Sequence, residues 1–195
     1  MNRMKTTGII LAGGKSSRMG QEKGLIVLNN KILIQHVIDA VSPLVSQIII
    51  IANSNHYDNL GYRVFSDLVA PCGPIGGIYT GLMNSNTKDN FVLSCDIPFI
   101  STKMLQYILK HSDNTDIALP IHHNVPEPLC AYYSKQCTGM LKQLIDLKEW
   151  KMNVAINSFD TKRIDVSTQE NFHENFINLN TPFELNTQTK FYGKY

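Results

Sequence analysis

Residues 8–23 read Gly-Ile-Ile-Leu-Ala-Gly-Gly-Lys-Ser-Ser-Arg-Met-Gly-Gln-Glu-Lys, a short apolar run followed by a glycine-rich loop with basic side chains. The apolar part, 8–11, predicts a buried β-strand that ends at 12–14. Glycines permit unusual backbone angles and close approach, so consecutive N–H groups of such a loop can point at one anion. The stretch therefore predicts a strand that leads into an anion-binding turn.

The rest of the chain alternates short β-branched runs with segments of helical period. Strands are expected at 48–51, 62–65, 91–93, 117–119 and 129–133. Helices are expected at 32–41, from 78 to 83, from Ser101 or Thr102 to Leu109, and at 138–147, with 74–77 as a loop. The uniformly β-branched run 48–51 is typical of a parallel strand covered on both faces. This rhythm predicts an α/β domain with a mostly parallel sheet.

Length and composition narrow the class of protein. The chain has 195 residues, which fits a single domain over 1–195, and we expect an ordered core at about 6–187 and a polar tail. A formal net charge of +2 without a basic run argues against a nucleic-acid partner. No apolar run approaches the length of a membrane span. The four scattered cysteines, without a C-x-x-C pair, predict reduced thiols, and we expect a cytoplasmic protein.

Polar residues follow several of the expected strands. Asn53 comes after 48–51, Asp67 after 62–65 and Asp96 after 91–93, while the glycine-rich loop follows the first strand. In open α/β sheets, ligands bind beyond the carboxyl ends of the strands. We therefore expect the loop and these three side chains to converge on one rim of the sheet.

The glycine-rich loop has the groups that bind a polyphosphate. The backbone at Gly13 and Gly14 can approach phosphate oxygens, while Arg18 offers a planar fork of donors and Lys23 a mobile charge. These residues are candidates to bind a triphosphate, and Arg18 and Lys23 to stabilise departing pyrophosphate in catalysis. The alternative is a glycine-rich turn with two surface cations. The spacing matches neither a Walker A loop nor a G-x-G-x-x-G motif, which argues against a nicotinamide-dependent oxidoreductase.

Asp96 directly follows the apolar run 91–93. A carboxylate at that place suits Mg²⁺, which proteins usually hold with one or two carboxylates together with substrate phosphates and water. The cation would offset charge that develops at the α-phosphorus. Asp96 is therefore a candidate metal ligand and catalytic residue, and an aspartate that caps a helix or turn is the alternative.

Asp67 and Asn53 are candidates to contact the base or ribose of a nucleotide. Guanine presents donors at N1 and N2 that a carboxylate can accept, a paired pattern that uracil and cytosine lack. Gly76 and Gly77, a few residues further on, would let the backbone approach the base. A surface aspartate and a turn-capping asparagine remain the alternatives.

At these motifs the chain resembles the molybdenum cofactor guanylyltransferases, within the wider superfamily of sugar and cofactor nucleotidyltransferases. The matching stretches run in family order from about residue 6 to residue 185. They are 11–14 with 18–20 and 23–24, Asn53, Asp67, 73–78 (Gly-Pro-Ile-Gly-Gly-Ile), 95–100 (Cys-Asp-Ile-Pro-Phe-Ile), 127–133 (Glu-Pro-Leu-Cys-Ala-Tyr-Tyr) and 178–182 (Asn-Leu-Asn-Thr-Pro). The first loop marks only the superfamily, and the later motifs narrow the resemblance.

The resemblance implies a three-layer α/β/α Rossmann-like nucleotidyltransferase fold. It also implies Mg²⁺-dependent transfer of GMP from GTP to the phosphate of molybdopterin, with release of pyrophosphate. The implied GTP contacts are Leu11, Ala12, Gly13, Lys23, Asn53, Asp67 and Asp96, with magnesium on Asp96. GTP and the molybdenum cofactor are the expected partners, together with enzymes that deliver or accept the cofactor.

The C-terminal part departs from related sugar enzymes, which place a second acidic metal ligand there. This sequence offers Asn178 and Asn180 instead, which are candidates for the acceptor side of the site. A cytidylyltransferase acting on the same cofactor and another nucleotidyltransferase of the superfamily are alternative functions. A non-catalytic nucleotide-binding module is a third, although it would be expected to have lost the loop or the metal carboxylate, and both are present.

Overall fold

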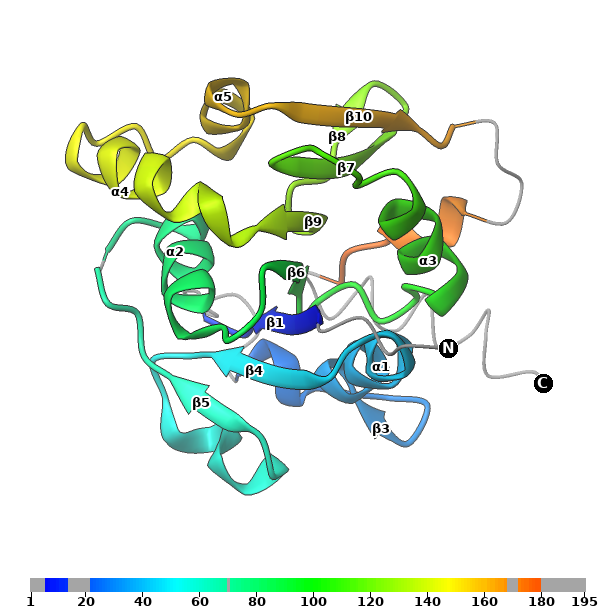
Figure 1. Cartoon of the computed structure of the whole chain (residues 1–195). Helices are drawn as coiled ribbons and strands as arrows, with labels where there is room; N and C mark the ends of the chain where they lie inside the picture. Colours follow the sequence, from blue (N-terminus) through cyan, green and yellow to red (C-terminus); the bar gives the residue numbers. More distant parts are fainter. Residues whose placement is uncertain (1–5, 14–21, 70, 168–171, 180–195) are drawn as a thin grey trace.

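The computed structural model describes residues 6–13, 22–69, 71–167 and 172–179. An eight-stranded sheet forms its centre, in the order β10-β7-β9-β6-β1-β4-β5, with β8 paired to β7 (Figure 1). The strands are β1 (Thr6–Leu11), β4 (Gln47–Ile51), β5 (Arg63–Phe65), β6 (Asp89–Ser94), β7 (Ile117–His122), β8 (Val125–Pro126), β9 (Cys130–Ser134) and β10 (Thr161–Asp165). A separate two-stranded sheet pairs β2 (Val27–Leu28) with β3 (Lys31–Ile32).

Most neighbouring strands run in parallel, as the sequence predicts. The parallel pairs are β1 with β4, β1 with β6, β4 with β5, and β7 with β10. Strand β9 runs antiparallel to both of its neighbours, β6 and β7. The amino end of β9 therefore lies at the same rim as the carboxyl end of β6.

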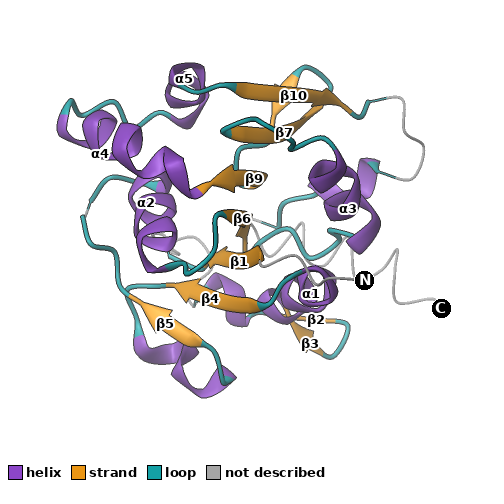
Figure 2. Ribbon diagram, viewed as in Figure 1, coloured by secondary structure: helices purple, strands orange, loops and turns teal. Residues whose placement is uncertain are grey.

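Helices cover both faces of the sheet and complete three layers (Figure 2). The helices are α1 (Leu33–Val41), α2 (Pro74–Asn84), α3 (Thr102–Lys110), α4 (Thr138–Asp146) and α5 (Met152–Ala155). Side chains alternate along a strand, so Ile10 packs into the core shared by α1 and α3, while Ile9 packs into the core shared by α2 and α4. The three-layer α/β/α architecture is confirmed.

The expected loop at 74–77 is wrong, because these residues form the first turn of α2. Pro74 occupies the first helical position, where a missing N–H costs nothing and the fixed φ favours the helix. The preceding Gly73 has φ 65°, which glycine adopts without strain. The helix thus begins directly at the rim, and its glycines Gly76 and Gly77 lie in its first turn.

Several short elements, β2, β3, β8, β10 and α5, were absent from the expectations. The hairpin β2–β3 turns at Asn29 and Asn30, both with positive φ, which asparagine tolerates better than most residues. Strand β10 adds an edge to the sheet, and only Ile164 among its residues is buried. The predicted cap at Ser101 is confirmed, since its side chain accepts a hydrogen bond from the backbone N–H of Met104.

All four cysteines, at positions 72, 95, 130 and 137, are buried free thiols. Burial raises the pKa of the Cys95 thiol to about 12, which keeps it protonated. In the described residues, no helix combines the length and the apolar character needed to cross a bilayer.

Candidate active site

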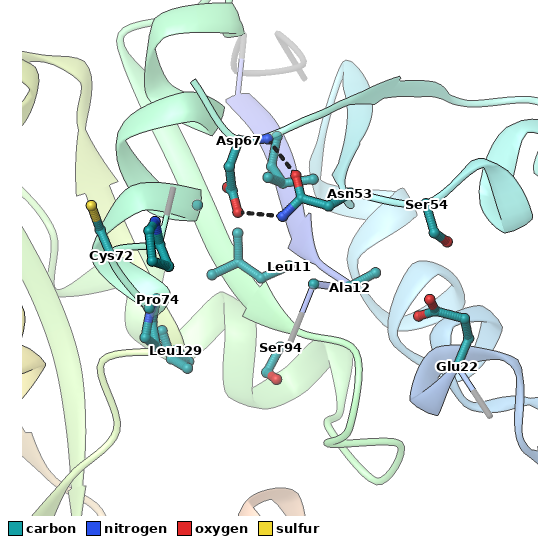
Figure 3. A pocket seen from close by; sticks show the side chains of 15 residues that line it. Leu11, Ala12, Glu22, Asn53, Ser54, Asp67, Cys72, Pro74, Ser94 and Leu129 are labelled. Atoms are coloured by element: carbon teal, nitrogen blue, oxygen red, sulfur yellow. Dashed lines mark hydrogen bonds between the residues drawn. The ribbon is translucent and has the colours of Figure 1, made fainter. Parts of the chain in front are cut away.

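The carboxyl ends of β6, β1, β4 and β5 lie side by side in the sheet, and a cavity of about 560 Å³ opens beside them. Its described lining comes from these strand ends, from the segments after β4 and β5, from the start of α2 and from the turn before β9. These residues are Leu11, Ala12, Gly13, Glu22, Ile51, Asn53, Ser54, Asp67, Pro71, Cys72, Gly73, Pro74, Gly77, Ser94 and Leu129 (Figure 3). Gly13, Asn53 and Asp67 thus converge on one rim as expected, while 14–21 of the first loop lie outside the described residues.

At one end of this cavity, Asn53 and Asp67 hold each other in place (Figure 3). The Asn53 amide donates to Asp67 Oδ2 at 2.9 Å, and the backbone N–H of Asp67 donates to Asn53 Oδ1 at 2.9 Å. Asp67 Oδ1 is buried and has no hydrogen-bond partner within the described ranges. Since an unpaired buried acceptor is costly, this oxygen is disposed to accept a hydrogen bond from a ligand.

Beside Asn53 and Asp67, the wall of the cavity is formed by the backbone at the start of α2. A Cβ added at Gly77 would lie 3.2 Å from Leu11 Cδ2 and 3.6 Å from Asp67 Oδ1. A side chain there would press on Leu11 and narrow the space beside the free carboxylate oxygen. The turn after Asp67 is fixed by the buried Thr80, whose hydroxyl accepts from the backbone N–H of Leu68 at 2.9 Å.

At the other end, Lys23 forms an ion pair with Asp96 Oδ2. The Ser94 hydroxyl donates to Asp96 Oδ1 at 2.5 Å, so both carboxylate oxygens are engaged. The two charged side chains are only 21% and 13% exposed. They do not line the cavity themselves, whereas their neighbours Glu22 and Ser94 do. The structure therefore brings Lys23 and Asp96 together at the edge of the cavity.

The C-terminal stretch lies against Asp96. The backbone N–H of Leu179 donates to the Asp96 carbonyl at 3.1 Å. Asn178 is exposed, and its amide lies 3.5 Å from the Phe176 carbonyl oxygen. The candidate residues Gly14, Arg18 and Asn180 lie outside the described residues.

Glu127 is a residue of this rim that the sequence analysis did not assign to the site. Burial, together with the negative charge of Asp96, raises the pKa of the Glu127 carboxyl to about 7. The β6–β9 ladder extends past β9, since the backbone N–H of Ser94 donates to the Leu129 carbonyl at 2.8 Å. Glu127 precedes β9, and the antiparallel direction of β9 brings it to the rim. The Glu-Pro-Leu stretch at 127–129 was the available signal, but it precedes a strand, whereas the site was expected beyond the carboxyl ends of strands.

The oxygen atoms at Asp96 are ligands that suit magnesium. They are hard oxygen atoms, the carboxylate itself and the Ser94 hydroxyl, and magnesium commonly needs only one or two protein carboxylates besides phosphates and water. No group of three or more His, Cys, Asp or Glu side chains suited to a metal occurs in the part of the chain that the structure describes. A closed structural zinc site, which uses four protein ligands, is not built from those residues.

A three-layer α/β/α fold with a cavity at the carboxyl ends of its parallel strands, and the Lys23–Asp96 pair at the edge of that cavity, is the arrangement of a nucleotidyltransferase. The chain belongs to the family described as the MobA-like NTP transferase domain, whose model matches residues 8–158.

Individual relatives agree with this assignment. The chain is 41% identical to a probable molybdenum cofactor guanylyltransferase of Flavobacterium johnsoniae, covering 92% of this chain and 94% of that protein. It is 37% identical to the molybdenum cofactor guanylyltransferase of Vibrio parahaemolyticus, covering 93% of each. The crystal structure of molybdopterin-guanine dinucleotide biosynthesis protein A from Archaeoglobus fulgidus superposes with a TM-score of 0.81 at 26% identity, covering 97% of this chain and 100% of that one.

Proposed function

We propose that this nucleotidyltransferase transfers GMP from GTP to the terminal phosphate of molybdopterin and releases pyrophosphate. The relatives named above carry this activity in their names. The observation that supports the proposal on this chain is one cavity with an unpaired Asp67 oxygen in it and with the Lys23–Asp96 pair at its edge, next to the lining residues Glu22 and Ser94. Such an arrangement suits a base and a polyphosphate bound by the same rim.

Asp67 reads the base in this proposal. Its Oδ1 accepts a hydrogen bond from N1–H or N2–H of guanine, while Asn53 holds the carboxylate in the required orientation. Cytosine offers only its exocyclic amine, so it satisfies the site less well. Leu11, Ala12, Gly13 and the first turn of α2 provide the apolar and backbone surface beside the base.

Lys23, Arg18 and the backbone of Gly13 and Gly14 bind the β- and γ-phosphates in this proposal. When phosphate oxygens become available, Lys23 exchanges its carboxylate partner for them, and the freed Asp96 carboxylate would be the residue that holds Mg²⁺. A cation held there would supply positive charge that offsets charge on the phosphates and at the α-phosphorus.

The acceptor phosphate then attacks the α-phosphorus in line with the departing pyrophosphate. The protein contributes positioning and charge stabilisation, and no covalent intermediate on a side chain is needed. Lys23 keeps its contact with the leaving pyrophosphate as negative charge builds up on it. Asn178, next to Asp96 through Leu179, and Asn180 are proposed for the acceptor side. Enzymes that deliver or receive the cofactor and a cytoplasmic location stay predictions.

The base is tested by thermal shift and calorimetry with GTP, CTP, ATP and UTP, each with magnesium. GTP is expected to bind at least about tenfold more tightly than CTP, since the wrong base leaves Asp67 Oδ1 unpaired. The Asp67→Asn variant, which offers a donor as readily as an acceptor, is expected to lose most of that preference. Tighter binding of CTP by the wild-type protein would identify a cytidylyltransferase instead.

A further inference from the structure

Gly24, which follows Lys23, lies close against two side chains from other parts of the chain, Tyr57 and Cys95. A Cβ added at Gly24 would lie 2.9 Å from the Tyr57 hydroxyl, 3.1 Å from Tyr57 Cε1 and 3.4 Å from Cys95 Cβ. The first of these separations is shorter than Cβ atoms tolerate, and the second is tight. Position 24 therefore has room for hydrogen and nothing larger, because Tyr57 and Cys95 fill the space that a Cβ would take.

Tyr57 also contacts the residue on the other side of Lys23. Its hydroxyl donates to Glu22 Oε2 at 3.3 Å, and its side chain is fully buried. Burial raises the pKa of Tyr57, so the phenol stays protonated and remains a donor. One buried ring thus touches the residues before and after Lys23.

The two side chains beside Gly24 come from segments that carry other residues of the site. Tyr57 lies in the 3-10 helix η3 (Asn55–Leu60), which starts two residues after Asn53. Cys95 directly precedes Asp96, the ion-pair partner of Lys23. Both side chains lie where a Cβ of residue 24 would stand, so the backbone next to Lys23 packs against the segments that carry Asn53 and Asp96.

We propose that Tyr57 is a positioning residue for nucleotide transfer: packed against Gly24 and bonded to Glu22, it sets Lys23 at the correct distance from Asp96 and from the base-binding segment. This inference rests on the proposed role of Lys23 in triphosphate binding. Because the ring fixes the Lys23 backbone without touching the nucleotide, its effect appears in the phosphate contacts and not in the contacts to the base. A misplacement of such a group by about 1 Å lowers turnover by up to about a hundredfold.

The test compares Gly24→Ala, Tyr57→Phe and the double variant with wild type. Gly24→Ala drives a Cβ into the Tyr57 hydroxyl, so the Lys23 backbone must move, and kcat is expected to fall roughly tenfold to a hundredfold. Tyr57→Phe removes the hydroxyl but keeps the ring, with an expected change of less than about threefold. The double variant removes the closest clash and is expected to recover most of the lost activity. Gly139→Ala is the matched control, because that glycine is exposed on α4 with open space around it.

A binding readout separates positioning from a loss of folding. The ratio of GMP to GTP dissociation constants reports the β- and γ-phosphate contacts without requiring turnover. Gly24→Ala is expected to shrink this ratio while leaving GMP affinity within about twofold, and Tyr57→Phe in the double variant is expected to restore it. An unchanged ratio in folded Gly24→Ala, or no recovery in the double variant, would overturn the proposal.

A replacement variant covers the case in which Gly24→Ala does not fold, and a transfer assay separates failure of the proposed function from failure of the role of Tyr57. If Gly24→Ala does not fold, Tyr57→Ala replaces it: the missing ring frees the Lys23 backbone, so the same ratio is expected to shrink, and an unchanged ratio overturns the proposal. If wild-type protein binds GTP more tightly than GMP but transfers no GMP to molybdopterin, the proposed function fails while the role of Tyr57 is still decided by the ratio.

Discussion

Lys23 and Asp96 compensate each other's charge in a place where neither side chain has much access to water. Under the proposed function, Lys23 pairs with the Asp96 carboxylate until phosphates draw the lysine away. Magnesium that arrives with a triphosphate would then satisfy both residues at once, so we expect metal and nucleotide to bind together.

Asp96→Asn tests the carboxylate. The amide keeps the size of the side chain and an oxygen for the Ser94 hydroxyl, so the melting temperature is expected to change little. The lost charge removes the site for the cation, and magnesium-dependent turnover is expected to fall at least about a hundredfold. Asp146→Asn, on an exposed carboxylate of α4, is the control and keeps full activity. Unchanged turnover in Asp96→Asn would refute the metal role.

Lys23→Ala tests the proposed role of the Lys23 ammonium group in phosphate binding. Under the proposed function its ammonium contributes charge-assisted hydrogen bonds to phosphates, so GTP affinity is expected to drop roughly tenfold to a hundredfold, as measured by calorimetry. GMP affinity should stay nearly constant because GMP lacks the β- and γ-phosphates. Lys31→Ala removes a lysine from a more exposed ion pair in the β2–β3 hairpin and serves as the control. An equal loss of GMP and GTP affinity would contradict the assignment.

At the scale of elements, the sequence predicts the parallel strands well, because continuous β-branched runs such as 48–51 have few other uses in a folded chain. It also predicts that residues after such strands meet at one rim, and Asn53 and Asp67 do so within hydrogen-bonding distance. The predicted start of α2 was wrong, because glycines at 76–77 look like loop residues in a sequence. Only the folded structure shows that Leu11 lies close to Gly77.

Two residues near the site, Glu127 and Tyr57, could not be predicted from the sequence because long-range pairing places them there. Glu127 reaches the rim only because β9 runs antiparallel to β6, and strand direction is not written in local patterns. In the sequence, Tyr57 looks like an ordinary residue of a polar segment. Its contact residue Gly24 lies 33 positions earlier in the chain, so no local pattern connects the two. Long-range pairing of this kind is a property of the folded chain and not of a sequence window.

At the scale of the whole molecule, Glu127 makes stability depend on pH. Its carboxyl has an ordinary pKa of 4.5 and a pKa of about 7 in the folded protein, so folding favours the protonated form. Below pH 4.5 the group is protonated in both states and costs nothing. As pH rises from about 4.5 through 7, the folded protein binds this proton more strongly than the unfolded chain does, and the free energy of unfolding falls. Above pH 7 the cost is complete and constant.

Glu127→Gln removes this titration while keeping the shape of the side chain. The variant and wild type are expected to have similar free energies of unfolding at about pH 5, and the variant should become more stable by about 1 kcal/mol at pH 8, a magnitude reduced by solvent screening of a half-buried carboxylate. Urea unfolding at a series of pH values, with chelator and without nucleotide, measures the difference directly. A difference that does not change between pH 5 and pH 8 would mean that the carboxyl is not held in its protonated form by burial and by Asp96. Glu127 would then already be ionised at pH 5 to 7, and over that range the rim would carry two charged carboxylates, Asp96 and Glu127, instead of one.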